Sequence, residues 1–214
     1  MEEREYLGKY VLLQPEEGFR LGEDTLELSR FATVRRGWRV CDLGCGSGAL
    51  GLLLLERQKD LNLTGVERDP AAVELASRNF QANGVCARVV HGDMRESGLL
   101  PTGGYDLVVS NPPWFPVGAG RSGGPARCEE GCALPELCEA AGRLARNGGR
   151  FALVHRPERL PDLFDALRKA GLEPKRVRLI QHGPAHPPSA VLVEAVRQGR
   201  PGLEVLPTLL RSRA

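Results

Sequence analysis

The stretch Asp42–Gly48, with the sequence DLGCGSG, decides how this chain of 214 residues folds. It lies between an apolar run at 38–43, which is typical of a buried strand, and a helical pattern at 49–58. Glycines at alternate positions let the backbone turn sharply and approach a ligand where a Cβ atom would collide. The stretch therefore predicts a strand, a tight turn and a helix, with a ligand cleft at the carboxyl end of the strand.

On both sides of this turn, short apolar or β-branched runs alternate with helical stretches. That alternation is typical of βαβ units and a parallel sheet. Further strands are expected at 61–67, 87–90, 105–110, 150–155, 175–181 and 190–196, and further helices at 70–82, 134–145 and 160–170. The last two strands are joined by a short Pro/Gly-rich turn, so they should pair antiparallel, because a parallel pair needs a crossover of a dozen or more residues. We expect an α/β fold with one Rossmann-like sheet of about seven strands, mostly parallel, ending in an antiparallel hairpin.

Composition and charge exclude several classes of protein. The chain carries 29 basic and 27 acidic side chains, and no apolar run approaches the roughly 20 residues of a membrane span. Residues 1–5 are acidic and lack the features of a signal peptide, so six cysteines favour reduced thiols in a cytoplasm. Residues 1–145 carry 16 basic and 21 acidic side chains, whereas residues 146–214 carry 13 and 6. The basic final third favours a polyanionic partner.

Three acidic side chains follow the ends of three successive expected strands: Asp42, Glu67 and Asp93. A carboxylate in the position of Glu67 can accept hydrogen bonds from a ribose diol. Asp42 would repel a pyrophosphate, but it suits a cationic amino-acid group. The glycine spacing is G-x-G-x-G rather than the G-x-G-x-x-G of dinucleotide sites, which disfavours a nicotinamide dehydrogenase. The pattern predicts a nucleoside pocket.

The fourth strand of the series ends in Asn111–Trp114, with the sequence NPPW. Two prolines fix φ and remove two backbone donors, leaving their carbonyls free to accept. Asn111 adds a side-chain carbonyl, and Trp114 offers an aromatic face on which stacking is worth roughly 1–3 kcal/mol. Hydrogen bonds from both hydrogens of a planar amine to Asn111 and the Pro112 carbonyl would make its nitrogen more nucleophilic, so catalysis would be mostly orientation and polarisation.

On these motifs the chain resembles the class I S-adenosylmethionine-dependent methyltransferases. NPPW is similar to the signature of amino-methyltransferases that act on adenine N6, guanine N2 or glutamine N5. Residues 14–25, 126–127, 154–160 and 173–176 add a similarity to the bacterial tRNA(Val) adenine-N6 methyltransferase family. The resemblance implies S-adenosylmethionine as cofactor and an RNA, with tRNA favoured, as partner, and it implies neither a metal nor a membrane. Trp114 stands where that family usually has Tyr, and Cys128 stands where it often has His.

The resemblance also implies roles for individual residues. The first acid and the glycine loop hold the methionine part of the cofactor, Glu67 holds the ribose, Asp93 contacts the adenine amine, and 19–25 closes over the cofactor. The expected cofactor-binding residues are Phe19, Arg20, Thr25, Asp42, Gly44, Cys45, Gly46, Gly48, Glu67, Arg68, Asp93, Met94 and Asn111. The expected catalytic residues are Asn111, Pro112, Pro113 and Trp114. Trp114 is also expected to bind the substrate, with Arg121, Arg127, Arg156, Arg159, Lys175, Arg176 and Arg178 as phosphate contacts.

We expect one methyltransferase domain over 1–214, in which 1–37 cover the cofactor or substrate and 38–214 form the catalytic sheet. Three other functions stay open: an N5-glutamine protein methyltransferase, a guanine-N2 rRNA methyltransferase, and a non-catalytic RNA-binding protein on the same fold. The first class normally carries an N-terminal helical domain, whereas only about forty residues precede the glycine loop here.

The connection 116–131 is rich in glycine, and loops of this length are usually functional or disordered. The spacing of Cys128, Cys132 and Cys138 fits neither a paired zinc site nor a ferredoxin run.

Overall fold

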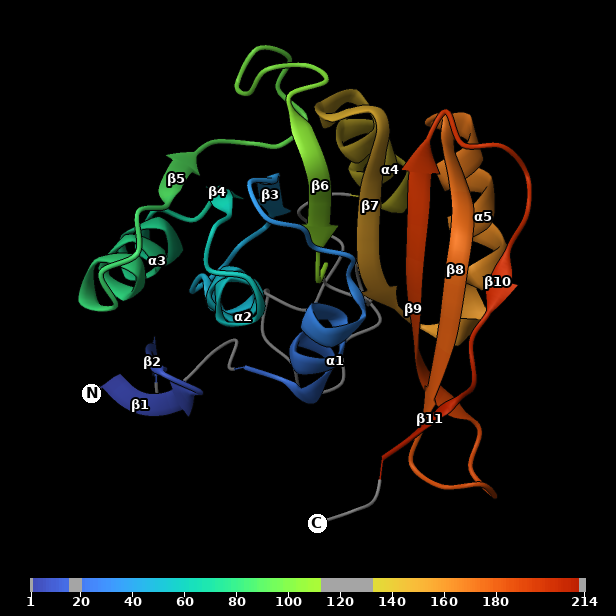
Figure 1. The fold of residues 1–214 in the computed structure, drawn as a ribbon, viewed down its shortest axis with the longest axis horizontal. Helices are drawn as coiled ribbons and strands as arrows, with labels where there is room; N and C mark the ends of the chain where they lie inside the picture. The colour runs from blue at the N-terminus through green and yellow to red at the C-terminus, as the bar shows by residue number, and fades with distance from the viewer. Residues whose placement is uncertain (1, 16–20, 113–132, 212–214) are drawn as a thin grey trace.

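The computed structural model describes residues 2–15, 21–112 and 133–211, and these form the α/β architecture that the sequence predicts (Figure 1). The elements in chain order are β1 (Glu2–Leu7), β2 (Tyr10–Pro15), α1 (Glu23–Phe31), β3 (Arg39–Leu43), α2 (Ala49–Arg57), β4 (Asn62–Glu67), α3 (Pro70–Ala82), β5 (Arg88–His91), β6 (Tyr105–Ser110), α4 (Leu134–Leu144), β7 (Ala145–His155), the 3₁₀ helix η2 (Pro157–Arg159), α5 (Leu160–Lys169), β8 (Leu172–Gln181), β9 (Pro188–Arg197), β10 (Glu204–Val205) and β11 (Leu209–Leu210).

The central sheet has the strand order β10-β8-β9-β7-β6-β3-β4-β5, with β11 also paired to β8. Strands β7, β6, β3, β4 and β5 are mutually parallel, and β9 runs antiparallel to both β7 and β8. The expected sheet of about seven strands with a final antiparallel hairpin is therefore confirmed in β3 to β9. Strands β10 and β11 were not expected from the sequence; they have two residues each and add to the edge of β8.

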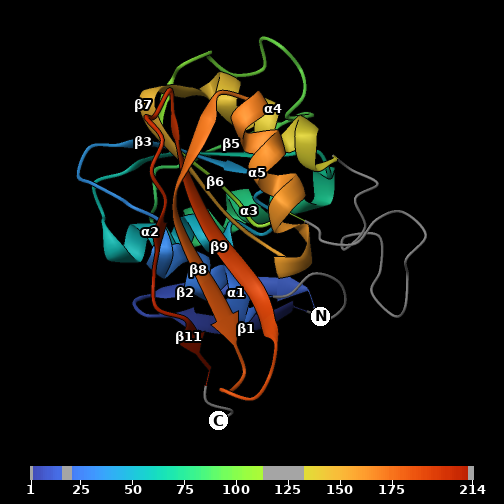
Figure 2. The same ribbon diagram turned by 90° about the vertical axis from the view of Figure 1, so that its right-hand side faces the viewer.

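Helices cover both faces of this sheet. One core cluster joins the sheet to α1, α2 and α3, with Leu28, Leu52 and Phe80 among its buried residues. The other joins the opposite face to α4 and α5, which lie together on one side of the strands in Figure 2. Burial on both faces explains why β6 and residues 151–154 of β7 are almost continuous apolar runs. The edge at which the parallel strands end is called the carboxyl edge, and in Figure 1 β6 and β7 run downward toward it.

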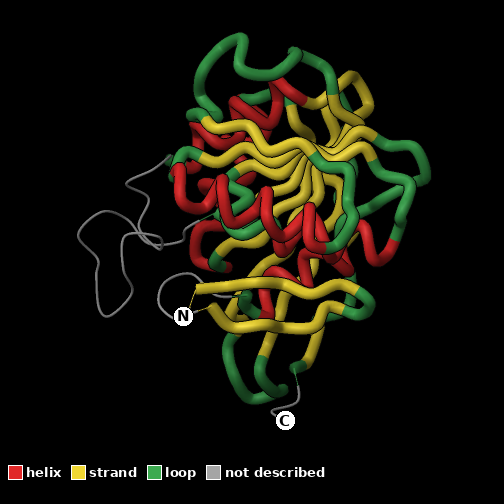
Figure 3. Tube along the Cα trace, turned by 90° about the vertical axis from the view of Figure 1, so that its left-hand side faces the viewer, coloured by secondary structure: helices red, strands yellow, loops and turns green. Residues whose placement is uncertain are grey.

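A separate antiparallel hairpin, β1–β2, lies outside the central sheet and was not expected (Figure 3). Asn79 of α3 accepts a hydrogen bond from Leu13 N at 2.7 Å and donates one to Leu13 O at 2.9 Å. Asn83 forms the equivalent pair with Val11 at 2.8 and 2.7 Å. Two amide side chains one helical turn apart thus form hydrogen bonds with the backbone of β2. These bonds explain why the hairpin docks against α3.

Strand β7 begins at Ala145, five residues before the expected strand at 150–155. Ala145 pairs with Tyr105 of β6, and the register then shifts before Arg150 pairs with Leu107. Arg146 in the shifted part contacts Asp106 at 2.6 Å. The Asn-Gly-Gly segment at 147–149, which was expected to form a turn, therefore lies within β7. Within the described ranges, no helix is both long and apolar enough to span a bilayer.

Candidate active site

The glycine loop after β3 forms an open turn at the carboxyl edge. Gly44, Gly46 and Gly48 have φ values of +69°, +53° and +80°, a region that only glycine enters without strain. The backbone N–H groups of Gly44 and Cys45 donate to Val66 O of β4 at 2.9 and 3.0 Å. A Cβ atom built on Gly46 would meet nothing within 4 Å. The loop therefore leaves space beside its backbone, as a ligand cradle requires.

Two of the expected loop residues face inward instead. The buried Cys45 side chain packs on Gly65 of β4, where an added Cβ atom would lie 2.7 Å from Sγ. A Cβ atom on Gly48 would lie 2.8 Å from the ring of Phe80. Only the backbone of Cys45 can therefore serve a ligand, and Gly48 is required for packing as well as for its positive φ.

Asp42, the last acid before the loop, is 2% exposed, and its Oδ2 has no hydrogen-bond partner among the described residues. Burial, followed by the negative charge of Glu67, raises the pKa of Asp42 to about 7. A buried acceptor without a donor is costly. A cationic donor placed beside it would relieve that cost and favour the ionised form.

Glu67 ends β4 and bends over the glycine loop. Its Oε2 accepts a hydrogen bond from Gly46 N at 3.0 Å, and its Oε1 accepts from Arg68 N at 2.8 Å and Asp69 N at 3.0 Å. Three backbone donors fix this carboxylate beside the cradle. Oε2, which accepts only one of these bonds, keeps further acceptor capacity for a hydroxyl group of a ligand.

Asp93 follows β5 and carries a strong internal partner. Arg95 Nε lies 2.9 and 3.0 Å from the two oxygens of Asp93, and Arg95 also reaches Glu136 at 3.4 Å. The hydrogen bond from Arg95 lowers the pKa of Asp93. The neighbouring Met94 places its Cε 3.8 Å from where a Gly44 Cβ would lie. Met94 therefore flanks the glycine loop, whereas Asp93 is already engaged by Arg95, a contact that was not expected from the sequence.

Asn111 follows β6 directly beside the loop, because Asp42 of β3 pairs with Val109 of β6. Ser110 Oγ ties the two strand ends by donating to Leu43 O at 2.8 Å. Asn111 Nδ2 donates to Thr25 Oγ1 of α1 at 2.8 Å. Among the described residues, no donor contacts the amide oxygen of Asn111, and the adjoining Pro112 is half-buried.

Several predicted residues lie outside the described part of the chain: Phe19, Arg20, Pro113, Trp114, Arg121, Arg127, Cys128 and Cys132. The third cysteine of that cluster, Cys138, is buried in α4. Asn79 was missed as a site residue. Its Nδ2 donates to Ser47 O at 2.9 Å and so joins the glycine loop to the hairpin. The sequence feature that could have identified Asn79 is an amide residue on the buried face of α3, the second helix after the glycine loop.

The predicted basic residues separate into two groups. Arg156 and Arg159 lie just beyond the carboxyl end of β7, and they pair with Glu158 at 3.0 Å and Asp162 at 2.8 Å. They share the carboxyl edge with Asn111, because β6 and β7 are parallel.

The other group lies within β8, short of that edge. Arg176 contacts Glu194 at 3.2 Å and Thr33 Oγ1 at 3.1 Å, and its guanidinium lies 4.7 Å from the ring centre of Phe31. Lys175 donates to Arg200 O at 3.0 Å. Arg176 therefore already has internal partners, and Lys175 is held by the chain just after β9. Arg178 likewise lies within β8, with a buried Nε that has no described partner.

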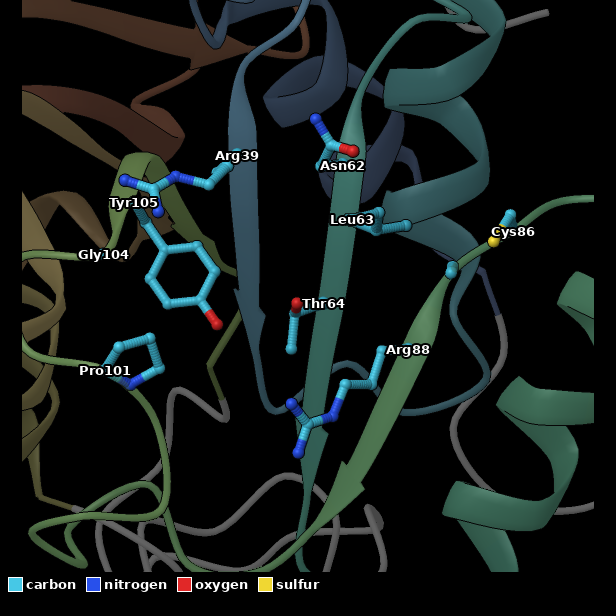
Figure 4. Close-up of a pocket in the computed structure, with 10 residues that line it drawn as sticks. Arg39, Asn62, Leu63, Thr64, Cys86, Arg88, Pro101, Gly104 and Tyr105 are labelled. Carbon is cyan, nitrogen blue, oxygen red and sulfur yellow. The ribbon is translucent and has the colours of Figure 1, made fainter.

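A pocket of about 320 Å³ lies at the opposite, amino-terminal edge of the sheet. Arg39, Asn62, Arg88 and Tyr105 line it, each at or near the beginning of a different strand (Figure 4). This pocket is therefore distinct from the glycine cradle.

A parallel sheet with an antiparallel β9 beside β7, a glycine loop after β3 and acids along its carboxyl edge define the class I methyltransferase fold. The sequence pattern of the methyltransferase small domain family matches residues 24–163, and the chain belongs to that family. In solved structures, a predicted O-methyltransferase from Agrobacterium tumefaciens superposes with a TM-score of 0.72 at 22% identity, covering 87% of this chain and 86% of the other, which supports the fold.

Two curated relatives carry the name tRNA1(Val) (adenine(37)-N6)-methyltransferase. The protein from a Flavobacteriaceae bacterium is 28% identical over 148 residues, 68% of this chain and 63% of its own length. The protein from Dickeya chrysanthemi is 36% identical over 141 residues, 63% of this chain and 56% of its own length. The match thus spans less than two thirds of either relative.

Proposed function

We propose that this chain transfers a methyl group from S-adenosylmethionine to the exocyclic N6 amine of an adenine in tRNA. The observation that carries the proposal is the placement of Asn111, whose amide oxygen keeps its acceptor capacity beside the open glycine loop. The names of the matched relatives support the choice of adenine and of tRNA.

The residues of the cradle fit the proposed cofactor. S-adenosylmethionine supplies an electrophilic methyl group on a cationic sulfonium. The orphaned Oδ2 of Asp42 would accept from the ammonium group of its methionine part, and Glu67 would accept from its ribose hydroxyls. Two acids so close together disfavour an anionic ligand and favour a cationic one. Asp93 would receive the adenine amine in exchange for one of the hydrogen bonds that Arg95 donates to it.

The acceptor half of the site would work mainly by orientation and polarisation. The lone pair of an adenine amine is delocalised into the ring, which makes the nitrogen a poor nucleophile. Asn111 Oδ1 and the Pro112 carbonyl would accept its two hydrogens and favour a pyramidal nitrogen whose lone pair faces the methyl group. No general base is needed before the attack, because the methylated nitrogen loses its proton readily afterwards.

An adenine in RNA must leave its stack to reach this edge. We propose that Trp114 stacks on the extruded base and that Arg156, Arg159 and the arginines of 113–132 contact phosphates around it. The chain would act as one domain over 1–214, in which 1–37 cover the cofactor or substrate. It would act on tRNA in the cytoplasm.

The test is transfer of labelled methyl from S-adenosylmethionine to bulk tRNA that lacks its modifications, followed by nucleoside analysis. We expect label in N6-methyladenosine with the wild-type chain and its loss with Asn111→Ala. The matched control is Asn147→Ala, which removes an exposed amide from the amino-terminal half of β7. It should keep the wild-type rate.

Each alternative gives a different result in the same assay. Label in N2-methylguanosine would indicate a guanine-N2 enzyme, and label on a glutamine of added protein would indicate an N5-glutamine enzyme. A chain that binds tRNA but shows no measurable affinity for S-adenosylhomocysteine would be an RNA-binding module. Any of these outcomes overturns the proposal.

A further inference from the structure

We propose that Arg211 is a positioning residue that sets the orientation of Asn111 through the first turn of α1. The inference rests on the proposed function, since it assigns how the amide that receives the acceptor amine is held. Neither the glycine loop nor the NPPW motif includes Arg211, and it lies 100 residues beyond Asn111 in the chain.

The first contact in this series joins Asn111 to α1. Asn111 Nδ2 donates to Thr25 Oγ1 at 2.8 Å, and Thr25 is only 4% exposed. An amide group has a donor end and an acceptor end, so a fixed partner for Nδ2 also fixes where Oδ1 points. In the structure, Thr25 holds the donor end of the Asn111 amide and so leaves the acceptor end available to an amine.

The second contact joins α1 to the end of the described chain. Arg211 Nη2 lies 2.9 Å from Asp24 Oδ1, and Arg211 Nη1 lies 3.2 Å from Glu23 Oε2. Both carboxylates belong to the first helical turn and immediately precede Thr25. The Arg211 and Asp24 side chains are only 12% and 25% exposed, so solvent screens this pair less than an ordinary surface pair, whereas Glu23 is 70% exposed.

Arg211 is itself held by the sheet. Its backbone N–H donates to Gln181 O at 2.8 Å, directly after β11 pairs with Ile180 and Gln181 of β8. Figures 1 and 2 both place β11 and α1 toward the carboxyl edge. The last strand therefore carries a guanidinium to the helix that contacts the acceptor site.

The far end of α1 has its own anchors. Arg57 donates to Ser29 O and Ala32 O, and Glu194 accepts from Thr33 N at 2.8 Å. At the beginning of the helix, Leu21 N donates to Gln14 Oε1 at 3.0 Å. Among the described side chains, Arg211 is the cation paired with the first-turn acids. Its removal should loosen the first turn while the rest of α1 stays in place.

The direct test is the NMR signal of the Asn111 side-chain amide in the full chain, assigned by its loss in Asn111→Asp. We expect Thr25→Val to abolish the exchange protection of the bonded amide proton and Thr25→Ser to keep it. Arg211→Ala should speed its exchange by about 3- to 10-fold, the effect of losing one modest interaction. The matched control is Arg30→Ala, which removes an exposed pair with Glu27 from the same helix. It should leave the exchange rate unchanged.

Kinetics with tRNA provide the second readout. Thr25→Val should lower kcat by about 10- to 100-fold, as expected when a reacting group loses its orientation. Arg211→Ala should lower kcat with little change in KM for tRNA, and Arg211→Lys should restore part of the loss. In the double variant kcat should fall no further than in Thr25→Val alone, because Arg211 acts through Thr25.

Unchanged amide exchange in Arg211→Ala overturns the inference, and so does an additive loss of kcat in the double variant. If Arg211→Ala fails to fold, Arg211→Lys carries the same test with one charge and a different donor geometry. A wild-type chain that methylates no tRNA would remove the proposed function. The amide exchange measurement would still decide whether Arg211 and Thr25 orient Asn111.

Discussion

Replacing Asp42 with Asn should make the fold more stable at neutral pH, and the gain should depend on pH in a defined way. Burial and the charge of Glu67 raise the pKa of Asp42 to about 7 from an ordinary value of 3.8. Between these two values the folded chain holds a proton at Asp42 that the unfolded chain has released. The contribution of Asp42 to the free energy of unfolding therefore falls as pH rises from about 4 to about 7.

The magnitude follows from the size of the shift. One pKa unit corresponds to 1.36 kcal/mol, so a rise of about three units costs the folded state roughly 4 kcal/mol once Asp42 is ionised. Asn keeps the shape of the side chain but does not titrate. The difference in unfolding free energy between Asp42→Asn and the wild type should therefore rise by roughly 4 kcal/mol from pH 4 to pH 7 and stay level above it.

Urea denaturation followed by far-UV circular dichroism, repeated from pH 5 to pH 8, measures this difference. Burial and Arg159 lower the pKa of His155 to about 4, which changes stability in the opposite direction over this range, but it acts equally in both proteins and cancels. The control is Asp106→Asn. Burial opposes ionisation of Asp106, but the hydrogen bonds from Arg146 and Arg39 N, together with the charges of these two arginines, outweigh it and lower the pKa of Asp106. Its stability difference should be flat from pH 5 to pH 8.

A flat difference for Asp42→Asn over the same range would refute the reasoning, because it would mean that Asp42 ionises in the fold as readily as in water. A constant difference in unfolding free energy added at every pH would not affect this test, because the new amide donor contributes equally at every pH.

Three further predictions test other parts of the account. Binding of S-adenosylhomocysteine should release about one proton near pH 6, because its ammonium group favours ionised Asp42, and calorimetry in buffers of different ionisation enthalpy measures this release. Its affinity should accordingly rise from pH 5 to pH 7. Gly48→Ala should destabilise the fold by about 1–3 kcal/mol in urea denaturation, since the added Cβ meets Phe80 at a positive φ. Glu194→Ala should cost roughly 3 kcal/mol, because it leaves two arginines without their buried partner, and a loss below 0.5 kcal/mol would contradict that role.

Local patterns were sufficient to predict the parts of the fold that depend on neighbours in sequence. The boundaries of α3 at Pro70 and Ala82 agree with the expectation because a proline at the first helical position and Asn-Gly at the end act locally. The strand 105–110 was recognised from its continuous apolar run. The acids Asp42 and Glu67 were placed correctly at strand ends because the βαβ unit brings successive strand ends to one edge.

Contacts between distant segments could not be predicted in this way. The hairpin β1–β2 docks through Asn79 and Asn83, which lie 66 to 72 residues from their partners. From the sequence, Arg176 was expected to be a solvent-exposed cation. In the structure it donates hydrogen bonds to Glu194 and to Thr33, and Thr33 lies 143 residues away in the chain. Arg95 binds Asp93 through three donor atoms, its backbone N, Nε and Nη2, and no motif specifies this contact. Each of these depends on which side chains meet after the sheet has formed.

The measurement that tests the central claim most directly is a crystal structure of the chain with S-adenosylhomocysteine bound. The account predicts its ammonium group beside Asp42, its ribose on Glu67 and its sulfur facing Asn111 Oδ1 at the carboxyl edge. A ligand bound elsewhere, such as in the pocket between Arg39 and Arg88, or an Asn111 amide whose oxygen points away from the sulfur, would contradict it.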